Sequence, residues 1–244
     1  MTSVNMALLG MQHPHSSAHL NTLLALDEVA SLYLWDDSEQ ALAPAQQRND
    51  NKIAAVYTEL NAVLARDDVD IVLVAQRNDL APDICVRALE AGKHVLAEKP
   101  IGRNAAETER VLTIARQNNR KLGVCYQNRA NPAVLDARRL IHEGLIGPLF
   151  SVEMRMITTQ VQFRDPDHWL FKAEISGGGM LSWLGCHYLD MMRYVTGDEI
   201  VSVMAEMAIR SDEEIDVEDV AVLSLRFRSG AVGSLHVGYM LTQS

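Results

Sequence analysis

Glu98, Lys99 and Pro100 are the consecutive residues of this chain that best suit chemistry. They follow His94 to Ala97, a short apolar run typical of a strand buried on both faces. Glu98 and Lys99 are then expected just past the carboxyl end of a parallel strand, where open α/β sheets bind ligands. Pro100 lacks a backbone donor and restricts Lys99 to extended geometry, which directs the lysine into a crevice. Alternatively, Glu98 and Lys99 form an exposed pair on a loop.

A second candidate segment begins at Gly10, directly after the apolar run of Val4 to Leu9. A dinucleotide-binding turn at this place has three glycines, for the turn, for close approach to pyrophosphate and for helix packing. Here Gly10 is present, and Gln12 and His15 stand near the other two positions. Ser16 can offer a donor at the N-terminus of the following helix.

His13 and His15 in the same turn also suggest a metal pair. With no carboxylate or cysteine nearby, we interpret them instead as turn residues or ligand contacts, and we expect no metal.

Polar residues also follow two further expected strands. Asp36 comes about 20 residues after the turn, where an acid can bind a ribose 2′-hydroxyl and repel a 2′-phosphate. Its alternative role is to cap the next helix. Gln76, Arg77 and Asn78 follow a later strand, and Arg77 suits either a phosphate or an acidic partner.

The second half of the chain offers a histidine on an expected helix. His187 and Asp190 are three residues apart and so share a helix face. A neutral imidazole is a plausible proton acceptor, although a structural histidine is also possible. Asp190 can orient the His187 ring or pair with Arg193. Trp169, before three consecutive glycines, suits either the core or a pocket wall.

The elements that must position these residues change in character near residue 126. Before it, short apolar strands alternate with helices, which predicts a parallel, doubly wound sheet. After it, long alternating strands predict an α+β unit whose mainly antiparallel sheet is open on one face.

The strands of the first half are expected at Val4 to Leu9, Ser31 to Trp35, Ala54 to Tyr57, Ile71 to Val74, His94 to Ala97 and Leu122 to Cys125. Those of the second half are expected at Leu149 to Gln160, Ile200 to Ile209, Val217 to Arg228 and Ala231 to Met240. Thr58 and Asn104 are the expected caps of two helices in the first half, and Gly179 to Val195 is expected to be one helix.

Composition limits the class of protein. The 244 residues carry a formal net charge of −10, which argues against binding to nucleic acid or to an anionic membrane surface. No apolar stretch approaches the roughly 18 residues that span a bilayer, and no signal peptide is recognisable. Three widely spaced cysteines fit no disulfide or metal pattern. We therefore expect a cytoplasmic protein with reduced thiols.

These segments together resemble the glucose–fructose oxidoreductase/inositol dehydrogenase/MocA family, over essentially the whole chain. The resemblance rests on Ala91 to Pro100, Gly177 to Gly179, Gly185-x-His187-x-x-Asp190, Asn128-Arg129 and Gly144-x-x-Gly147. It implies an NAD(P)-binding Rossmann domain over residues 1–125, and a substrate-binding domain over residues 126–244 whose open sheet makes homodimer or homotetramer contacts.

The resemblance also implies an NAD(P)-dependent oxidoreductase that acts on a hydroxyl or carbonyl group of a sugar, an inositol or another cyclic alcohol. Lys99 matches the lysine near the nicotinamide and the reacting hydroxyl, and His187 matches the histidine that carries the proton. Asp36 favours NAD over NADP, although NADP remains possible. The expected cofactor contacts are Gly10, Gln12, His13, His15, Ser16, Asp36, Gln76, Asn78, Glu98 and Lys99. The expected substrate contacts are Lys99, Arg129, Trp169, Trp183 and His187.

The chain departs from the family pattern in several places. Gln12 and His15 interrupt the glycine turn, and Gln76-Arg77-Asn78 replaces the usual Thr-Pro-Asn. Trp183 stands where the family often has an aspartate, and an indole cannot accept a hydrogen bond from a sugar hydroxyl. This suggests a flatter or less polar substrate. The chain is also shorter than is usual in the family, which leaves open whether Ser244 is its natural end.

Two alternative functions fit the same residues. A non-catalytic relative would bind a small molecule or a partner as a sensor or regulator, which the interrupted turn and Trp183 favour. A hydrolase or lyase could use NAD without net redox change. Lys99 and His187 favour the dehydrogenase.

Overall fold

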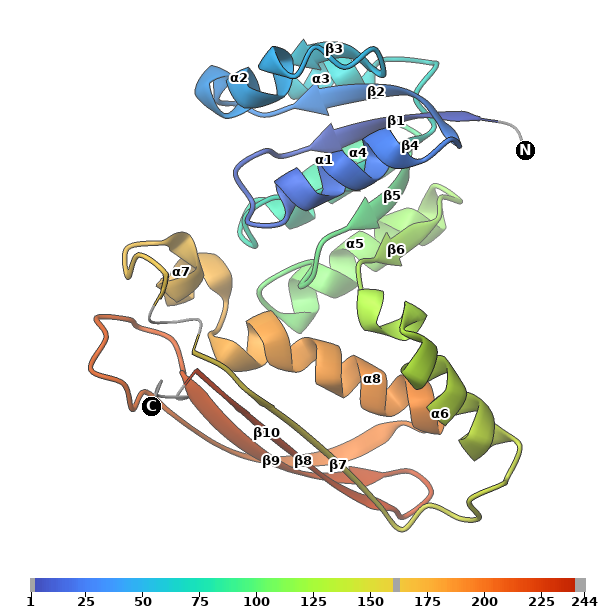
Figure 1. Cartoon of the computed structure of the whole chain (residues 1–244), viewed down its shortest axis with the longest axis vertical. Coiled ribbons are helices and arrows are strands. Elements are labelled where there is room, and N and C mark those ends of the chain that lie inside the picture. The colour runs from blue at the N-terminus through green and yellow to red at the C-terminus, as the bar shows by residue number, and fades with distance from the viewer. Residues whose placement is uncertain (1–2, 160–162, 240–244) are drawn as a thin grey trace. The chain divides into compact units, whose positions relative to one another are not determined.

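The computed structural model describes residues 3–159 and 163–239, and the chain divides into two compact units, residues 1–125 and 126–244 (Figure 1). The predicted strand ends at Gln160 and Met240, and the chain end at Ser244, lie outside the described residues. Within the described ranges, no helix is both long and apolar enough to cross a membrane.

The first unit is built on a parallel sheet of six strands in the order β3-β2-β1-β4-β5-β6. This is the strand order of a Rossmann fold, so the predicted doubly wound sheet is confirmed. The strands are β1 (Val4–Leu9), β2 (Val29–Trp35), β3 (Ile53–Tyr57), β4 (Ile71–Val74), β5 (His94–Ala97) and β6 (Leu122–Val124).

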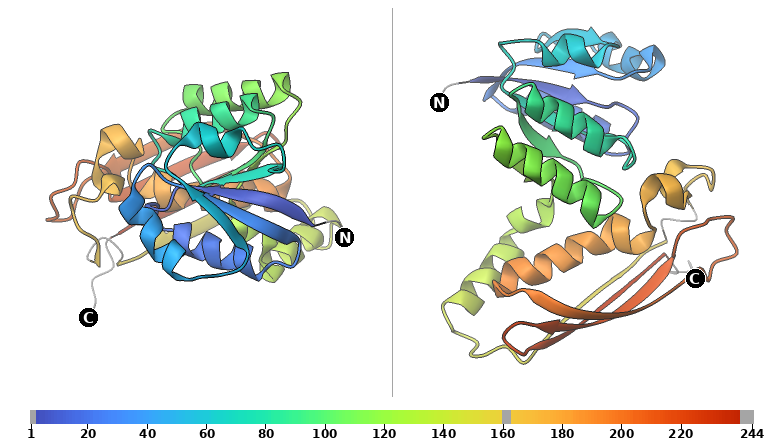
Figure 2. Two further views of the ribbon diagram at one scale, coloured as in Figure 1. Left: turned by 90° about the horizontal axis from the view of Figure 1, so that it is seen from above. Right: turned by 180° about the vertical axis from the view of Figure 1, so that it is seen from behind.

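Helices cover both faces of this sheet, as its central strands require. Ala7, Leu8 and Leu9 of β1 are fully buried because one face packs on α1 and α2 and the other on α3, α4 and α5 (Figure 2). The helices are α1 (Ser16–Ala25), α2 (Glu39–Gln47), α3 (Leu60–Leu64), α4 (Ala81–Glu90) and α5 (Ala105–Gln117). Continuous apolar runs such as β4 are therefore explained by burial on both sides.

The two predicted helix caps have different outcomes. Asn104 caps α5, because its side-chain oxygen accepts a 3.0 Å hydrogen bond from the Glu107 N–H. Thr58 was expected to cap α3, and this is wrong. The N-cap position is Glu59, one residue later, and no side chain caps this short helix.

The second unit contains a four-stranded mixed sheet in the order β7-β10-β9-β8. β7 runs parallel to β10, whereas the other two pairs are antiparallel, so the predicted mainly antiparallel sheet is confirmed. Ser229 and Gly230 form the predicted tight turn between β9 and β10, with Gly230 at φ +97°. The strands are β7 (Ser151–Ile157), β8 (Ile200–Ala208), β9 (Val220–Phe227) and β10 (Val232–Gly238).

The helix predicted over Gly179 to Val195 is interrupted. A π-helical turn, η4 (Leu181–Gly185), precedes α8 (Cys186–Thr196), and π turns are frequent at functional sites. Met192 of α8 and the inward residues of the sheet form one core. The remaining helices of this unit are η1 (Gln127–Ala130), α6 (Pro132–His142), η3 (Trp169–Phe171) and α7 (Ala173–Ser176).

Candidate functional site

The turn after β1 requires glycine at position 10. Gly10 has φ +109°, and a Cβ atom there would lie 2.1 Å from the carbonyl oxygen of Ala75, which follows β4. The Ser16 hydroxyl donates a 2.8 Å hydrogen bond to the carbonyl oxygen of Gly10 and so ties the start of α1 to the turn. This position therefore keeps the close backbone approach of a dinucleotide-binding turn although Gln12 and His15 replace the other glycines.

Asp36 holds this turn from the end of β2. Its carboxylate is fully buried, and Oδ2 accepts a 2.7 Å hydrogen bond from the Met11 N–H. Oδ1 accepts two hydrogen bonds of 2.9 Å, from the Gln12 side-chain amide and the Ser38 N–H. Each carboxylate oxygen can accept about two hydrogen bonds. Oδ2 therefore keeps an acceptor position that a ribose hydroxyl could use.

The segment after β4 has one polar pair of its own. Arg77 binds Asp79 through two hydrogen bonds, Nε–Oδ1 of 3.1 Å and Nη2–Oδ2 of 2.7 Å. The structure therefore gives Arg77 an acidic partner, one of the two roles that the sequence left open. Gln76 and Asn78 are buried at the same edge of the sheet.

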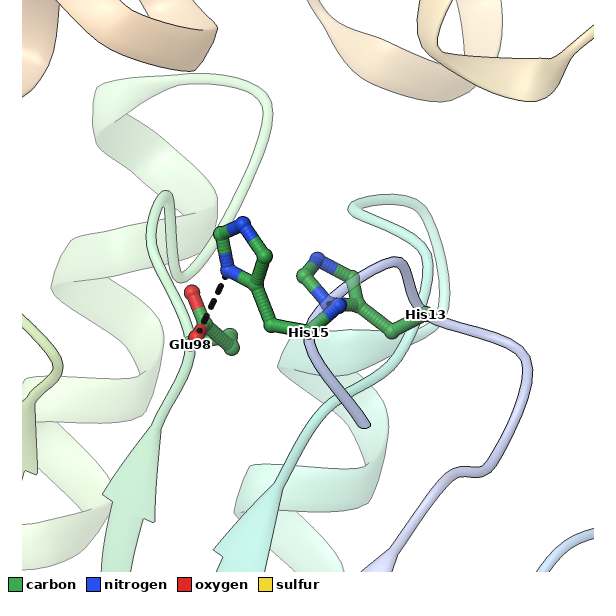
Figure 3. A group of neighbouring side chains, drawn as sticks. All are labelled: His13, His15 and Glu98. Atoms are coloured by element: carbon green, nitrogen blue, oxygen red, sulfur yellow. Dashed lines mark hydrogen bonds and ion pairs between the residues drawn. The ribbon is translucent and has the colours of Figure 1, made fainter. Parts of the chain in front are cut away.

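Glu98, at the end of β5, lies between the imidazoles of His15 and His19 at the start of α1. Figure 3 shows its contact with His15. Its Oε1 is 3.0 Å from Nδ1 of His15 and 2.5 Å from Nε2 of His19. Its Oε2 accepts a 3.0 Å hydrogen bond from the Lys99 N–H. Burial by itself would raise the pKa of Glu98, but the hydrogen bonds from His15 and His19 hold that pKa well below its usual range.

This geometry corrects one argument from the sequence. The histidine pair was set aside as a metal site because no carboxylate or cysteine lay nearby, and this premise is wrong. The fold brings Glu98 to His15 across 83 residues. His19 was missed as a site residue. Its signal was the spacing of four from His15, which places both on one helix face.

His13 has a different environment from its neighbours. Its ring is buried, and its Nδ1 accepts a 3.1 Å hydrogen bond from the His15 N–H. Burial lowers the pKa of His13 to about 3, so the ring is neutral at physiological pH. Lys99, beyond Glu98, is fully buried, and the peptide bond between Lys99 and Pro100 is cis.

In the second unit, the glycine segment is shaped by Glu218. A Cβ atom at Gly179 would lie 2.0 Å from the carbonyl oxygen of Glu218, so the backbones touch there. The Glu218 carboxylate accepts hydrogen bonds of 2.7 Å from the Gly179 N–H and 3.0 Å from the Leu181 N–H. Glu218, which the sequence did not single out, thus fixes the backbone that leads into η4 and α8.

The Tyr126 ring packs against the histidine of α8. His187 is buried and meets the Tyr126 ring edge to face, with centroids 5.7 Å apart. Burial raises the pKa of Tyr126, so this phenol stays protonated. Trp169 and Trp183 form a second perpendicular pair with centroids 6.0 Å apart, and Trp183 is buried.

Arg129 and Asp190 form a two-pronged ion pair within the second unit. Nε of Arg129 donates a 2.8 Å hydrogen bond to Oδ2 of Asp190, and Nη2 bonds Oδ1. Arg193, one of the partners considered for Asp190 from the sequence, pairs with Glu199 instead. Arg129 was expected to contact the substrate; in the structure its guanidinium binds Asp190 and so links η1 to α8.

Both units match models of known protein families. Residues 4–126 match an oxidoreductase family with an NAD-binding Rossmann fold, and residues 134–244 match the GFO/IDH/MocA C-terminal domain.

The chain belongs to the GFO/IDH/MocA family.

Relatives in this family are about a quarter to a third identical to the chain over the residues that align. It is 30% identical to levoglucosan dehydrogenase of Pseudarthrobacter phenanthrenivorans, over 73% of this chain and 51% of that protein. It is 27% identical to myo-inositol 2-dehydrogenase of Thermotoga maritima, over 88% of this chain and 63% of that protein. The chain thus spans about half to two thirds of the length of these relatives.

Solved structures of the family superpose on the whole described fold. A levoglucosan dehydrogenase complex with NADH and levoglucosan has a TM-score of 0.88 at 26% identity, covering 98% of this chain and 68% of that one. An oxidoreductase domain protein from Kribbella flavida has a TM-score of 0.89 at 26% identity, and the match covers 100% of this chain and 69% of that one. The predicted family is confirmed.

Burial of neutral His13 predicts a loss of stability in mild acid. Its folded pKa lies below the unfolded value of 6.5, so protonation favours the unfolded chain as the pH falls below about 6.5. Between pH 7.5 and pH 5 this lowers the free energy of unfolding by about 2 kcal/mol. His13→Asn keeps an acceptor for the His15 N–H. In urea unfolding, its free energy of unfolding should fall by about 2 kcal/mol less between these two pH values than that of the wild type. His142→Asn, at an exposed histidine, is the control. An equal pH dependence in wild type and His13→Asn would contradict this account.

Proposed function

We propose that this chain carries out NAD(P)-dependent hydride transfer between a nicotinamide cofactor and a hydroxyl or carbonyl group of a sugar, an inositol or another cyclic alcohol. The observation that carries the proposal is the buried lysine Lys99, which follows β5 at the sheet edge where Gly10 opens the turn after β1. Relatives named as dehydrogenases of levoglucosan and myo-inositol support this substrate class.

The residues of the first unit fit a dinucleotide. Gly10 lets the turn after β1 pass against the Ala75 carbonyl oxygen. No side chain caps the N-terminus of α1. The Ser16 N–H bonds the His13 carbonyl oxygen, and the N–H groups that follow it suit a phosphate. The remaining acceptor position of Asp36 suits a ribose hydroxyl, and its negative charge disfavours the 2′-phosphate of NADP. The remaining contacts we assign to the cofactor are Gln12, His13, His15, Ser16, Gln76, Asn78 and Glu98.

The chemistry divides between the cofactor and two side chains. A bound NAD supplies the hydride acceptor. The Lys99 ammonium stabilises negative charge that develops on the substrate oxygen. A ring nitrogen of His187 accepts the hydroxyl proton. Glu98 acts indirectly, because its carboxylate binds the Lys99 N–H and so fixes the backbone that carries the lysine.

The second unit shapes the choice of substrate. The perpendicular pair of Trp169 and Trp183 presents carbon-rich surface near the start of α8, which favours a flatter or less polar substrate than an open-chain polyol. Asp190, one helical turn after His187 in α8, forms an ion pair with Arg129. We therefore assign two roles to Arg129: it positions the helix that carries the histidine, and it contributes to the substrate region.

We further propose that the chain forms homodimers or homotetramers in the cytoplasm. β8 is an edge strand of nine residues in the described sheet, and its apolar side chains Val201, Val203, Met204 and Met207 are exposed. A long apolar edge is a template for contact with another chain. Cys85, Cys125 and Cys186 form no disulfide with one another, which suits a reducing compartment.

Two buried lysines flank β5 and provide a matched test of catalysis. Lys99→Met should lower the rate of nicotinamide-dependent turnover by about 10² or more, because the charge at the reacting oxygen is lost. Lys93→Met removes the other buried ammonium, whose Nζ binds the Arg66 carbonyl oxygen at 2.5 Å, and should leave the rate per folded molecule within a few-fold. The assay follows NADH absorbance with levoglucosan, myo-inositol and D-xylose. Equal rates in the two variants would overturn the role of Lys99.

Calorimetric titration with NAD, NADH, NADP and NADPH separates the oxidoreductase from the alternative functions. We expect binding of NAD or NADH in the micromolar range, about −8 kcal/mol. Asp36→Ala should reduce the preference for NAD and NADH over NADP and NADPH. Asp37→Ala, at the exposed neighbouring residue, should retain this preference. Absence of binding to the folded chain would favour the non-catalytic relative. Two observations support that alternative: Gln12 and His15 stand at the glycine positions, and the Gln12 side chain is bonded to Asp36.

The proposed assembly is tested by one charge on the open face of the sheet. Met204, 75% exposed in β8, becomes charged in Met204→Glu, which should shift the assembly toward the monomer in sedimentation velocity. Leu145→Glu is a control at an exposed apolar residue outside the sheet and should sediment as the wild type does. A monomeric wild type would contradict the proposal.

A further inference from the structure

We propose that the first unit contains a binding site for a transition-metal dication of the zinc class, with His19, Glu98 and Cys125 as ligands. The site lies at the carboxyl edge of the Rossmann sheet, in the same part of the fold as the β1–α1 turn. It goes beyond the proposed oxidoreductase function, because hydride transfer to a nicotinamide does not itself require a metal.

The donor atoms of these side chains already converge. Nδ1 of His15 and Nε2 of His19 point at the same oxygen, Oε1 of Glu98, at 3.0 and 2.5 Å. Donor atoms of His19, Glu98 and Cys125 all lie within 4.8 Å of one another. Ligands of a tetrahedral zinc lie about 3.5 Å apart, given metal–ligand distances of about 2.0–2.3 Å. Small side-chain rotations would therefore be enough to surround an ion.

The backbone that carries these ligands is fixed by regular structure. β5 and β6 are paired neighbours with Ala97 opposite Val124, so Glu98 and Cys125 are the next residues of adjacent strands. The Cys125 N–H donates a 2.9 Å hydrogen bond to the Ala97 carbonyl oxygen, which continues this pairing. His15 is the N-cap residue of α1, and His19 lies one turn further on. Ligands on such elements need little ordering when an ion binds.

His13 belongs to the same cluster but is a poor ligand. Figure 3 shows its ring beside His15 and Glu98. Its Nδ1 accepts a hydrogen bond from the His15 N–H, so in a neutral ring the proton must reside on Nε2. Neither nitrogen then has a lone pair to offer. His13 is therefore left out, and the ligand set is His19, Glu98 and Cys125.

The donor set selects the class of ion. One imidazole nitrogen, one carboxylate oxygen and one thiolate sulfur suit zinc with an open fourth position, whereas magnesium and calcium prefer oxygen ligands alone. Glu98 is 6% exposed, while the side chains of His15 and His19 are 33% and 19% exposed, so an ion can reach the carboxylate past the imidazoles. Binding would release the Cys125 thiol proton, because the thiolate is the ligand.

Cobalt(II) provides a spectroscopic probe of this site that needs neither substrate nor cofactor. The full chain, freed of metal by a chelator, should bind one cobalt ion per molecule. It should then show a thiolate-to-cobalt charge-transfer band together with the visible bands of a tetrahedral ion. Cys125→Ser should abolish the charge-transfer band and weaken zinc binding in calorimetry by about tenfold or more, the scale on which even outer-shell changes act. Cys186→Ser removes a cysteine of the second unit and should retain both signals.

A second variant keeps the test decisive if Cys125→Ser does not fold. His19→Gln leaves the thiol in place and should weaken zinc binding by a similar factor, while circular dichroism verifies the fold. The proposal is overturned if the wild type binds no stoichiometric metal or shows no charge-transfer band. It is equally overturned if that band survives in Cys125→Ser, or if zinc affinity is unchanged in His19→Gln. Glu98 is also among the contacts assigned to the cofactor, so the metal titrations are run without nucleotide, and the nucleotide titration measures nicotinamide binding separately.

Discussion

The buried carboxylate of Glu98 is the constraint on which the functional edge of the first unit depends. A carboxylate removed from water costs several kcal/mol unless charged or hydrogen-bonding partners replace its hydration. Here His15, His19 and the Lys99 N–H provide those partners. The histidines belong to the start of α1 and the carboxylate to the end of β5, so satisfying one buried charge also holds the turn after β1 against the segment that carries the lysine.

Acidic side chains hold backbone loops elsewhere in the chain as well. Asp36 accepts hydrogen bonds from the Met11 and Ser38 N–H groups, and Glu218 does the same for Gly179 and Leu181. Carboxylates are acceptors alone when ionised, which matches them to N–H groups that a tight turn leaves unpaired. This explains how the turn after β1 keeps its shape with Gln12 in place of a glycine. The side chain of Gln12 joins the same carboxylate through its amide.

The second unit depends on contacts between segments that are distant in sequence. Arg129 precedes α6 and Asp190 lies in α8, 61 residues later, and their ion pair fixes the helix that carries His187. Glu218 fixes the start of the same helical region from the segment before β9. The histidine is thus oriented by groups that do not touch it.

The sequence by itself determined the elements, the two-part organisation of the chain and the family. Strand and helix periodicity and the Asn104 cap are local signals, because neighbouring residues alone decide them. Glu98 and Lys99 were recognisable for the same reason, since their positions follow from the end of one strand. The tertiary structure decided which charged groups meet. Glu98 finds His19 across 79 residues, and Asp190 finds Arg129 instead of Arg193. Such pairs depend on strand order and on the paths of the crossover helices, and no local spacing in the chain encodes either.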